Sequence, residues 1–252
     1  MRVVKLGGRV QSDAALPAVL AAAWRESAAL VVVHGGGDEV SALQAAFGRQ
    51  SQFVDGKRVT ATEDLELLRM ALSGSANKRL VAALVGAGLP AVGISGEDAG
   101  MLQAAAETRE TLGEVGTPSQ VDATLMQHLL SGGFCPVVSP LARDRDSQAG
   151  GVLNVNGDDA AAAIAVALHA DELLLVSDVA GVLVDGAALT QLDADGAREL
   201  MVQGIARGGM AAKLEAALGA LQRGVARVRI GDVSALTDAT HGTVITLAGV
   251  SA

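Results

Sequence analysis

Short, nearly continuous apolar runs alternate with longer alanine- and leucine-rich stretches along most of this chain. A run without polar alternation is typical of a strand buried on both faces of a parallel sheet. Such runs are Arg2–Leu6, Leu30–Val33, Ala91–Ile94, Pro136–Ser139, Glu172–Ser177 and Ala226–Ile230. Helical spacing of apolar residues occurs in Ala14–Arg25, Asp38–Phe47, Thr62–Ser73, Ala76–Gly86, Gln120–Ser131, Asp158–Leu168 and Lys213–Arg223. The alternation predicts an α/β fold with a mostly parallel sheet covered by helices on both faces.

Two polar stretches depart from this pattern. Gln103–Gly116 is polar and mixed and leads into a turn at Thr117-Pro118, so we expect a surface hairpin or excursion rather than core. Asp144–Gly151 is polar and ends in glycine, which predicts a loop before the sequence LNVNGDD.

The length of 252 residues allows one large α/β domain or two intimately joined lobes. Half of the residues are apolar and 19% are charged, which is typical of a soluble globular protein. The longest uncharged apolar run, Ala160–Leu168, is far shorter than the ~20 residues of a membrane-spanning helix. The first predicted strand begins at the second residue. Cys135 is the single cysteine of the sequence. We therefore expect no targeting peptide, no intrachain disulfide and a cytoplasmic location.

The charge pattern bears on the kind of ligand. The formal net charge is −9, and the chain has no tyrosine and no block of lysine and arginine. Nucleic-acid-binding proteins usually present a basic face with stacking aromatic residues, so nucleic acid is disfavoured as a partner. An anionic ligand must be held by a few local cations and by backbone amides.

Two predicted strands end in glycine, the first at Gly7-Gly8 in VVKLGG and the second at Gly35–Gly37 in VVVHGGG. Glycine lets backbone N–H groups approach a ligand closely, and a following helix N-terminus favours an anion. In a parallel sheet, ligands bind beyond the carboxyl ends of the strands, where both breaks lie. One Gly-Gly pair alone is more often an ordinary turn, so the interpretation depends on the residues that accompany it.

Lys5 lies inside the first of these strands, where an unpaired ammonium group would be costly. It either extends to solvent or has an anionic partner. Four other segments carry polar, charged or glycine residues that could form a ligand site together with Lys5. They are DGKRVT at Asp55–Thr60, LNVNGDD at Leu153–Asp159, SDVAG at Ser177–Gly181 and GGMAAK at Gly208–Lys213. One Asn or Asp of LNVNGDD is expected to cap the helix that follows, and His34 is expected to support the second glycine turn.

These residue types suit phosphoryl transfer by positioning and charge neutralisation. Two lysines and glycine amides can surround a phosphoryl group, an arginine can hold a carboxylate, and an aspartate can hold the lysines. The Walker sequence, the GxGxxG dinucleotide sequence and the HRD and DFG elements of protein kinases are absent. An acceptor that is already a carboxylate needs no general base. The sequence shows no Ser–His or Cys–His arrangement that would favour nucleophilic catalysis instead of phosphoryl transfer.

The ordered set VVKLGG, VVVHGGG, DGKRVT, SGSANKRL, LNVNGDDAA, LLLVSDVAGVL and GGMAAKLEAAL resembles the acetylglutamate kinases of the amino acid kinase family. Each segment alone is a weak signal, but the set is highly specific and spans essentially the whole chain. The resemblance implies a three-layer αβα sandwich around one open, mainly parallel sheet. Residues 1–170 would form an N-terminal lobe for the amino acid and for dimerisation, and residues 171–252 a C-terminal lobe for ATP.

The resemblance also implies the reaction, which is transfer of the γ-phosphoryl group of MgATP to the side-chain carboxylate of N-acetyl-L-glutamate, the second step of arginine biosynthesis. The implied catalytic residues are Lys5, Lys213, Asp158 and Gly8. The lysines would stabilise the transition state, the aspartate would orient both lysines, and the glycine would donate an amide. Further amide donors and substrate-binding residues would be Gly36, Gly37, Arg58 and Asn154. The nucleotide site would be lined by Asp178, Val179, Ala180, Gly181, Val182, Leu183, Ile205, Ala206 and Arg207.

The chain departs from the family pattern in three places. Gly157 stands where the pattern has alanine, and Ala211-Ala212 before Lys213 lacks the usual larger residue. No helix precedes the first strand, which resembles the dimeric branch that arginine does not inhibit, so we expect a homodimer.

The four histidines show no metal-ligand spacing. We therefore expect no protein-bound metal and a Mg²⁺ ion held through the nucleotide.

Two alternatives remain. The same chemistry could act on another acceptor, either N-succinylglutamate or a carrier-protein-linked glutamate or aminoadipate. The segment around Arg58 matches the type that uses free acetyl-amino acids, and no basic patch for an acidic carrier is visible in the sequence.

The chain could also be a regulatory binding protein that has lost catalysis, but such a protein would be expected to lose Lys5, Asp158 or Lys213, and all three are present.

Overall fold

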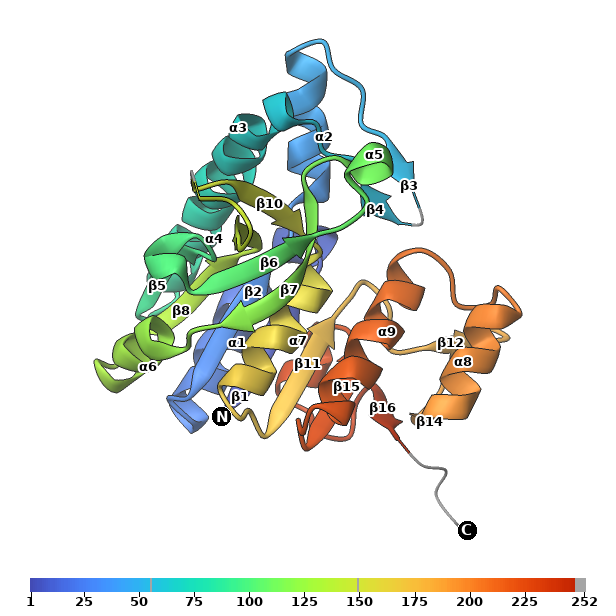
Figure 1. The fold of residues 1–252 in the computed structure, drawn as a ribbon. Coiled ribbons are helices and arrows are strands. Elements are labelled where there is room, and N and C mark those ends of the chain that lie inside the picture. Colours follow the sequence, from blue (N-terminus) through green and yellow to red (C-terminus); the bar gives the residue numbers. More distant parts are fainter. Residues whose placement is uncertain (55, 149, 248–252) are drawn as a thin grey trace.

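An eight-stranded sheet forms the centre of the fold (Figure 1). The computed structural model describes residues 1–54, 56–148 and 150–247. The strands are β1 (Arg2–Leu6), β2 (Leu30–His34), β5 (Ala91–Ser95), β8 (Cys135–Ser139), β11 (Glu172–Val176), β14 (Gln191–Asp193), β15 (Arg227–Gly231) and β16 (Thr243–Thr246). Their order is β14-β16-β15-β11-β1-β2-β8-β5, and the strands from β15 to β5 are all parallel. β16 runs antiparallel to β15 and parallel to β14.

All six strands predicted from apolar runs are present in this sheet, each within one residue of its predicted ends. β14 and β16 were not predicted, because they are short and lie at one edge, where burial imposes a weaker pattern. β1 pairs directly with β11, so the sheet is continuous across the predicted lobe boundary near residue 170.

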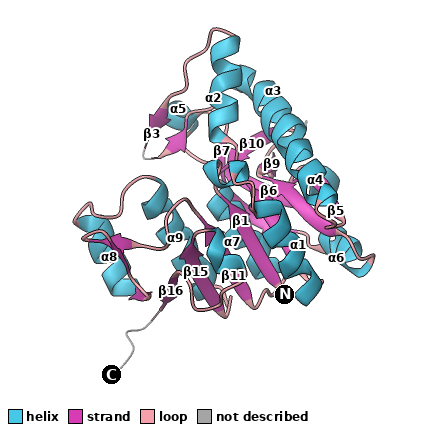
Figure 2. Cartoon of the chain, turned by 180° about the vertical axis from the view of Figure 1, so that it is seen from behind, coloured by secondary structure: helices cyan, strands magenta, loops and turns pink. Residues whose placement is uncertain are grey.

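Helices cover both faces of the sheet (Figure 2). Val3 and Leu175 pack in one core with Ile164 of α7 (Gly157–Ala167) and with residues of α9 (Gly209–Gln222). Their neighbours along the strands, such as Val4, point to the opposite face and pack with α1 (Leu16–Glu26) and α4 (Asn77–Gly86). Both faces of each strand are therefore buried, as continuous apolar runs predict. The predicted three-layer αβα architecture is confirmed.

A smaller closed sheet lies above the central one in Figure 1. It consists of β6 (Leu102–Ala106), β7 (Val115–Val121), β9 (Leu141–Asp144) and β10 (Val152–Val155). The prediction of a surface excursion at Gln103–Gly116 was therefore only partly right. β6 and β7 do form an antiparallel hairpin, but Ala104 and Val115 are buried because this sheet closes on itself around them. Of the predicted loop Asp144–Gly151, Asp144 ends β9, residues 145–148 and 150–151 lie between β9 and β10, and residue 149 lies outside the described residues.

Several helix boundaries differ from the predicted ones. Residues 62–86 form one continuous helical segment rather than two helices: a 3-10 turn (Thr62–Asp64), α3 (Leu65–Leu68), a π-helical stretch (Arg69–Ala76) and then α4. α6 (Thr124–Ser131) begins four residues after the predicted start at residue 120, because β7 continues to Val121. α9 begins at Gly209, four residues before the predicted Lys213.

The remaining elements are short or peripheral. They are α2 (Gly37–Ala46), α5 (Arg109–Leu112), α8 (Ala194–Val202) and two strand pairs, β3 (Phe53–Val54) with β4 (Lys57–Arg58) and β12 (Leu183–Val184) with β13 (Ala187–Ala188). α2 packs with α3 and the π-helical stretch around Val40, Leu68 and Leu72. Over the described ranges, no helix has the length and apolar character needed to span a membrane.

Candidate active site

The candidate site lies at the carboxyl ends of β1, β2 and β11, where both glycine loops leave the sheet. β1 pairs in register with both neighbours, so the three strands end together. The amide of Gly7 donates a hydrogen bond to the carbonyl of Val176 (3.1 Å), and that of Gly35 donates to the carbonyl of Leu6 (3.1 Å). These bonds hold the start of each loop against the neighbouring strand, so the two loops leave the sheet side by side.

Two lysines from distant parts of the chain meet on one carboxylate. Nζ of Lys5 in β1 lies 3.0 Å from Oδ1 of Asp158, and Nζ of Lys213 in α9 lies 3.2 Å from Oδ2. All three residues are buried, with exposed fractions of 7%, 8% and 3% for Lys5, Lys213 and Asp158. Lys5 therefore has the anionic partner that its position requires, and it does not extend to solvent.

Local sequence explains this convergence. Lys5 is two residues from Val3 in β1, so both face α7 and α9. Asn156 caps α7 by accepting a 2.8 Å hydrogen bond from the amide of Asp158, which confirms the predicted capping role. Asp158 thus lies in the first turn of α7, and Lys213 lies in the second turn of α9.

The electrostatics of the three groups are coupled. Burial would raise the pKa of Asp158, but the charges of Lys5 and Lys213 outweigh it, and the pKa lies below its ordinary value. The pKa of Lys213 is lowered, first by burial and then by the neighbouring charge of Lys5. Two ammonium groups share one carboxylate, so the cluster carries net positive charge beside the glycine loops. Such a cluster can bind an additional anion.

Gly157 leaves room for one of these lysines. A Cβ atom at this position would lie 3.2 Å from Cε of Lys5, which is tighter than an ordinary contact. The departure from the alanine of the family pattern therefore bears directly on the packing of Lys5.

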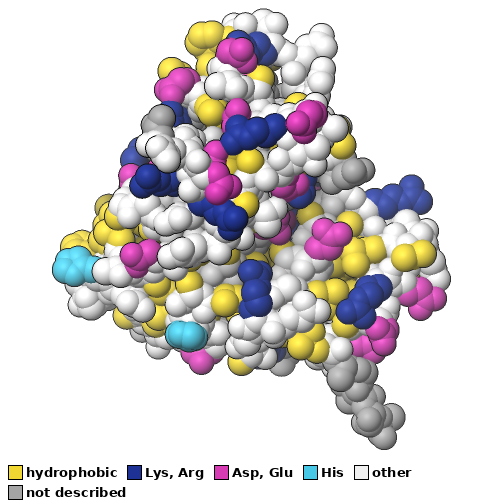
Figure 3. All heavy atoms as spheres, viewed as in Figure 1, with side chains coloured by type: hydrophobic (Ala, Val, Ile, Leu, Met, Phe, Trp, Pro, Cys, Tyr) yellow, Lys and Arg dark blue, Asp and Glu magenta, His cyan; other side chains and the backbone are white. Residues whose placement is uncertain are grey.

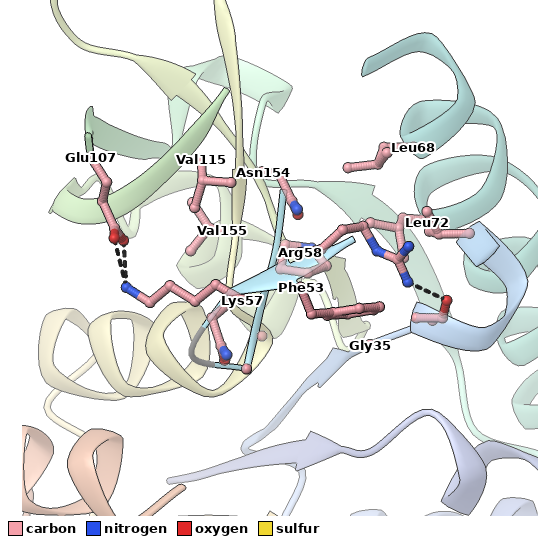
Figure 4. Close-up of a pocket in the computed structure, with 17 residues that line it drawn as sticks. Gly35, Phe53, Lys57, Arg58, Leu68, Leu72, Glu107, Val115, Asn154 and Val155 are labelled. Carbon is pink, nitrogen blue, oxygen red and sulfur yellow. Dashed lines mark hydrogen bonds and ion pairs between the residues drawn. The ribbon is translucent and has the colours of Figure 1, made fainter. Parts of the chain in front are cut away.

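Two pockets flank the buried cluster. The first lies between β4, β7, β10, α2 and the π-helical stretch (Figure 4) and is lined by Gly35, Gly36, Gly37, Val40, Phe53, Gly56, Lys57, Arg58, Leu68, Leu72, Glu107, Val115, Pro140, Asn154, Val155, Asn156 and Gly157. The second is lined by Lys5, Gly7, Gly8, Arg9, Val10, Gly37, Asp38, Ser177, Asp178, Val179, Gly209, Met210 and Lys213. Gly37 lines both, so the pockets adjoin at the second glycine loop.

Arg58 lines the first pocket, but its guanidinium group already has several acceptors. Nη1 donates to Gln44 (2.7 Å) and Ser51 (2.6 Å), and Nη2 donates to the carbonyl of Gly37 (2.7 Å) and to Ser41 (2.8 Å). Burial lowers the pKa of this arginine. The side chain is thus fixed at the pocket wall with its four terminal N–H groups paired, so a bound carboxylate would accept from the Nε–H group or displace one of these acceptors.

The opposite wall holds an ion pair that the sequence did not predict. Nζ of Lys57 lies 2.7 and 2.8 Å from the two carboxylate oxygens of Glu107 (Figure 4). The only sequence signal was a lysine beside Arg58 in DGKRVT. Between the two walls, Asn154 donates a 3.0 Å hydrogen bond to Thr60.

The residues predicted to line the nucleotide site are only partly brought together. Asp178 and Val179 line the second pocket, together with the predicted Gly8, Lys5 and Lys213. As far as the described residues go, Ala180–Leu183 and Ile205–Arg207 line neither of the two pockets. Some of them are buried: Val182 and Ala206 are 1% and 5% exposed. Across the described ranges, no three His, Cys, Asp or Glu side chains are placed to hold a metal ion.

Residues 1–232 match the amino acid kinase family. The chain belongs to the amino acid kinase family. This amino acid kinase is 42% identical over 247 residues to the acetylglutamate kinase of Chloroflexus aurantiacus, covering 95% of this chain and 96% of the relative.

Solved structures support the same fold for this amino acid kinase. The smu.665 protein from Streptococcus mutans is 29% identical, with a TM-score of 0.88 and coverage of 98% of both chains. Carbamate kinase from Giardia lamblia bound to citric acid has a TM-score of 0.74 over 97% of both chains. Its sequence identity is 15%, so this likeness concerns the fold alone.

Proposed function

We propose that this amino acid kinase transfers the γ-phosphoryl group of ATP to the side-chain carboxylate of N-acetyl-L-glutamate. The observation that carries the proposal is the buried cluster of Lys5, Asp158 and Lys213 between the two pockets. Its net positive charge lies where a phosphoryl group would pass from one pocket to the other. The identity to acetylglutamate kinases over nearly the whole chain supports the choice of acceptor.

The transfer needs no general base from the protein. A side-chain carboxylate oxygen of the acceptor forms the new P–O bond while the bond from the γ-phosphorus to the β-γ bridging oxygen breaks, giving an acyl phosphate and ADP. Negative charge on the transferring oxygens would be met by Lys5 and Lys213 and by the amides of Gly8, Gly36 and Gly37. Asp158 is a positioning residue here, because it holds both lysines without contacting the substrate.

The first pocket would hold the acetylated amino acid. Arg58 and Asn154 line it, and the guanidinium group suits a carboxylate, with the acceptors already on it limiting how that carboxylate approaches. Gly36 and Gly37 lie at its inner end, next to the second pocket. An acceptor bound in this way would direct its side-chain carboxylate toward the lysines.

The second pocket would hold the phosphates of ATP. Of the residues predicted for the nucleotide, Asp178 and Val179 line it, and Ala180–Leu183 and Ile205–Arg207 are proposed to contact the nucleoside beyond it. Mg²⁺, bound through the phosphate oxygens, would neutralise part of their charge. On this proposal, residues 1–170 bind the amino acid and residues 171–252 bind ATP, with the first glycine loop of the N-terminal lobe also lining the phosphate pocket.

We also propose that the protein acts in the cytoplasm as a homodimer, with the N-terminal lobe forming the interface. The homodimer is what the resemblance to the acetylglutamate kinases implies, and the single cysteine, which is buried and free, suits a reducing compartment such as the cytoplasm. Sedimentation equilibrium of the purified protein would give twice the chain mass of 25.2 kDa. A monomer would refute this part of the proposal and leave the chemistry untouched.

A carrier-protein-linked acceptor is less well supported. An acidic carrier would need a basic docking surface. On the face drawn in Figure 3, basic and acidic side chains are interspersed and form no continuous basic patch. This face lies over the small closed sheet and α7, so it gives no support to carrier docking there.

The acceptor is tested by trapping the acyl phosphate with hydroxylamine. The purified protein is offered N-acetylglutamate, N-succinylglutamate, glutamate and aspartate in parallel with ATP and Mg²⁺, and Lys5→Ala serves as the control. Hydroxamate formed with N-acetylglutamate alone, and lost in the variant, is the expected result. Preference for another acceptor would overturn the substrate assignment, and no hydroxamate with any acceptor would overturn the proposed reaction.

A further inference from the structure

The side chain of Gln11 connects the two glycine loops. Gln11 lies in a short 3-10 helix (Arg9–Ser12) that directly follows Gly8. Its Nε2 donates a 2.8 Å hydrogen bond to the carbonyl of Gly35 in the second loop and makes a longer contact of 3.5 Å with the carbonyl of Gly7. A residue of the first loop therefore holds a backbone carbonyl of the second.

His34 also contacts the carbonyl of Gly35. Its Nδ1 lies 2.8 Å from the oxygen of Gly35, and its Nε2 lies 3.0 Å from Nδ2 of Asn77. The amide nitrogen of Asn77 can only donate, so Nε2 accepts and the ring proton is on Nδ1. Burial lowers the pKa of His34 to about 4, which keeps the ring neutral at neutral pH. This contact confirms that His34 supports the glycine turn.

Anchoring this carbonyl fixes the direction of the next amide. No cis peptide bond occurs among the described residues, so the Gly35 carbonyl and the Gly36 N–H point in opposite directions. The Gly36 N–H thus points away from Gln11 and His34, and within the described structure it has no hydrogen-bond acceptor. Gly36 lines the first pocket, whereas Gln11 and His34 line neither the first nor the second pocket.

His34 constrains the shape of the second glycine loop, whereas Gln11 constrains the distance between the two loops. His34 is adjacent to Gly35 in the chain, so its contact fixes the turn internally. Gln11 belongs to the other loop, so its bond fixes the distance between the amide of Gly8 and the amide of Gly36. A Cβ atom built at Gly35 would lie 3.8 Å from the nitrogen of Gly8, which shows how closely the loops approach.

We infer that Gln11 is a positioning residue that holds the amide donors of the two glycine loops at the spacing required by the transferring phosphoryl group. The inference rests on the proposed phosphoryl transfer, because it assigns these amides to that group. Gln11 would act through the Gly35–Gly36 peptide and would not touch substrate. Its loss should therefore lower kcat and leave the KM for ATP nearly unchanged.

The kinetic test uses three variants at two adjacent positions, Gln11 and Ser12. Gln11→Met keeps the length of the side chain and removes the donor, so kcat should fall about ten-fold, the effect of losing one hydrogen bond. Ser12→Ala is the matched control in the same short helix and should behave as wild type. An unchanged kcat in Gln11→Met, or an equal loss in Ser12→Ala, would overturn the inference.

Gln11→Glu adds a signature that a merely structural role would not produce. An ionised carboxylate repels the carbonyl oxygen of Gly35, whereas a protonated carboxyl group can donate to it. The kcat of this variant, relative to wild type, should therefore rise as the pH falls from about 8.5 to about 5.5, approaching the protonation range of glutamate. The ratio for Gln11→Met should stay flat. Parallel profiles for the two variants would contradict the assigned hydrogen bond.

A second readout is independent of any substrate. Protein labelled with glycine carrying both carbonyl ¹³C and ¹⁵N gives ¹³C-edited amide signals only from Gly-Gly peptides, which are Gly7-Gly8, Gly35-Gly36, Gly36-Gly37, Gly132-Gly133, Gly150-Gly151 and Gly208-Gly209. In Gln11→Met, the signals of the first three should shift or broaden and the others should not. Unchanged signals would overturn the inference. If wild type fails to phosphorylate N-acetylglutamate but these signals move, the proposed function fails while the assigned contact stands.

Discussion

Lys213 of α9 donates a 3.2 Å hydrogen bond to Asp158 of α7, joining two helices that begin 52 residues apart in the chain. The two helices pack on the same face of the sheet. The bond fixes a cation from the C-terminal part of the chain beside the second glycine loop. It is the contact on which the proposed chemistry most depends.

Replacement of Asp158 by alanine is expected to abolish activity and weaken the fold. It leaves Lys5 and Lys213 buried side by side without an anion, at a cost of about 3–5 kcal/mol of unfolding free energy. Urea titrations at pH 7 measure the loss. Asp159→Asn, one residue along α7, is the control and should retain turnover. An Asp158→Ala protein with wild-type stability would show that the cluster does not stabilise the fold.

The contribution of Asp158 should depend on pH in a defined direction. Its pKa is lower in the folded protein, so the stabilisation is fully present above the ordinary aspartate pKa of about 4. It is lost as the pH falls through the lower folded-state value. The stability difference between wild type and Asp158→Ala should therefore be constant near neutrality and shrink in acid. A difference that grows in acid would contradict the ion-pair account.

Asp159 should show the opposite dependence. Burial raises its pKa to about 6, aided by the charges of Asp158, Glu107 and Glu215 and opposed by Lys57. A raised pKa means that its ionisation destabilises the folded state, so the penalty appears as the pH rises from about 4 to about 6. Asp159→Asn should therefore be more stable than wild type above pH 6, by on the order of 1–3 kcal/mol, and no more stable near pH 4. Thermal unfolding across this range tests the prediction, and a gain that is independent of pH would refute it.

The two lysines should contribute to turnover more than to nucleotide binding. Lys5→Met and Lys213→Met are each expected to lower kcat by about 10²–10³, because each removes a preorganised charge from the transition state. Calorimetric titration with MgATP should show affinities within a few-fold of wild type. A variant that binds ATP normally and turns over normally would exclude that lysine from the reaction.

Lys57 and Glu107 should tune acceptor binding in opposite directions. An anionic acceptor in the first pocket is attracted by the lysine and repelled by the glutamate. Lys57→Met should raise the KM for N-acetylglutamate and Glu107→Gln should lower it, each by about two- to five-fold at low salt. Steady-state kinetics at two ionic strengths measure both effects. Changes of the same sign would show that the pair acts through the shape of the pocket rather than through charge.

The sequence predicted the centre of the fold well because burial on both faces gives an unambiguous pattern. The strand from Arg2 to Leu6, for example, carries no polar alternation and is found as predicted. The small closed sheet was missed because its strands carry no continuous apolar run: Ala104 and Val115 are core, while Gln103 and Glu114 beside them are polar. The break predicted at Gly74 and Ser75, between two helices, was wrong, because a glycine flanked by serines resembles a loop although the helical segment continues through it.

The site was predictable where a motif places a charge in a buried position. Lys5 was singled out on that basis, the resemblance to the family added Asp158 and Lys213, and the structure brings the three residues together. Gln11 and the Lys57–Glu107 pair depend on contacts between segments that are distant in sequence, and no local pattern marks them. The partners of Arg58 on α2 are likewise visible only in three dimensions.

The fate of one oxygen atom shows whether the γ-phosphoryl group is transferred to the side-chain carboxylate. N-acetylglutamate carrying ¹⁸O in its side-chain carboxylate is incubated with ATP, Mg²⁺ and the wild-type protein, and the products are observed by ³¹P NMR. Transfer to this carboxylate predicts an acyl phosphate resonance with the isotope shift of a directly bonded ¹⁸O, appearing together with ADP. An unshifted phosphorus signal, or ADP released with inorganic phosphate alone, would contradict transfer to that carboxylate.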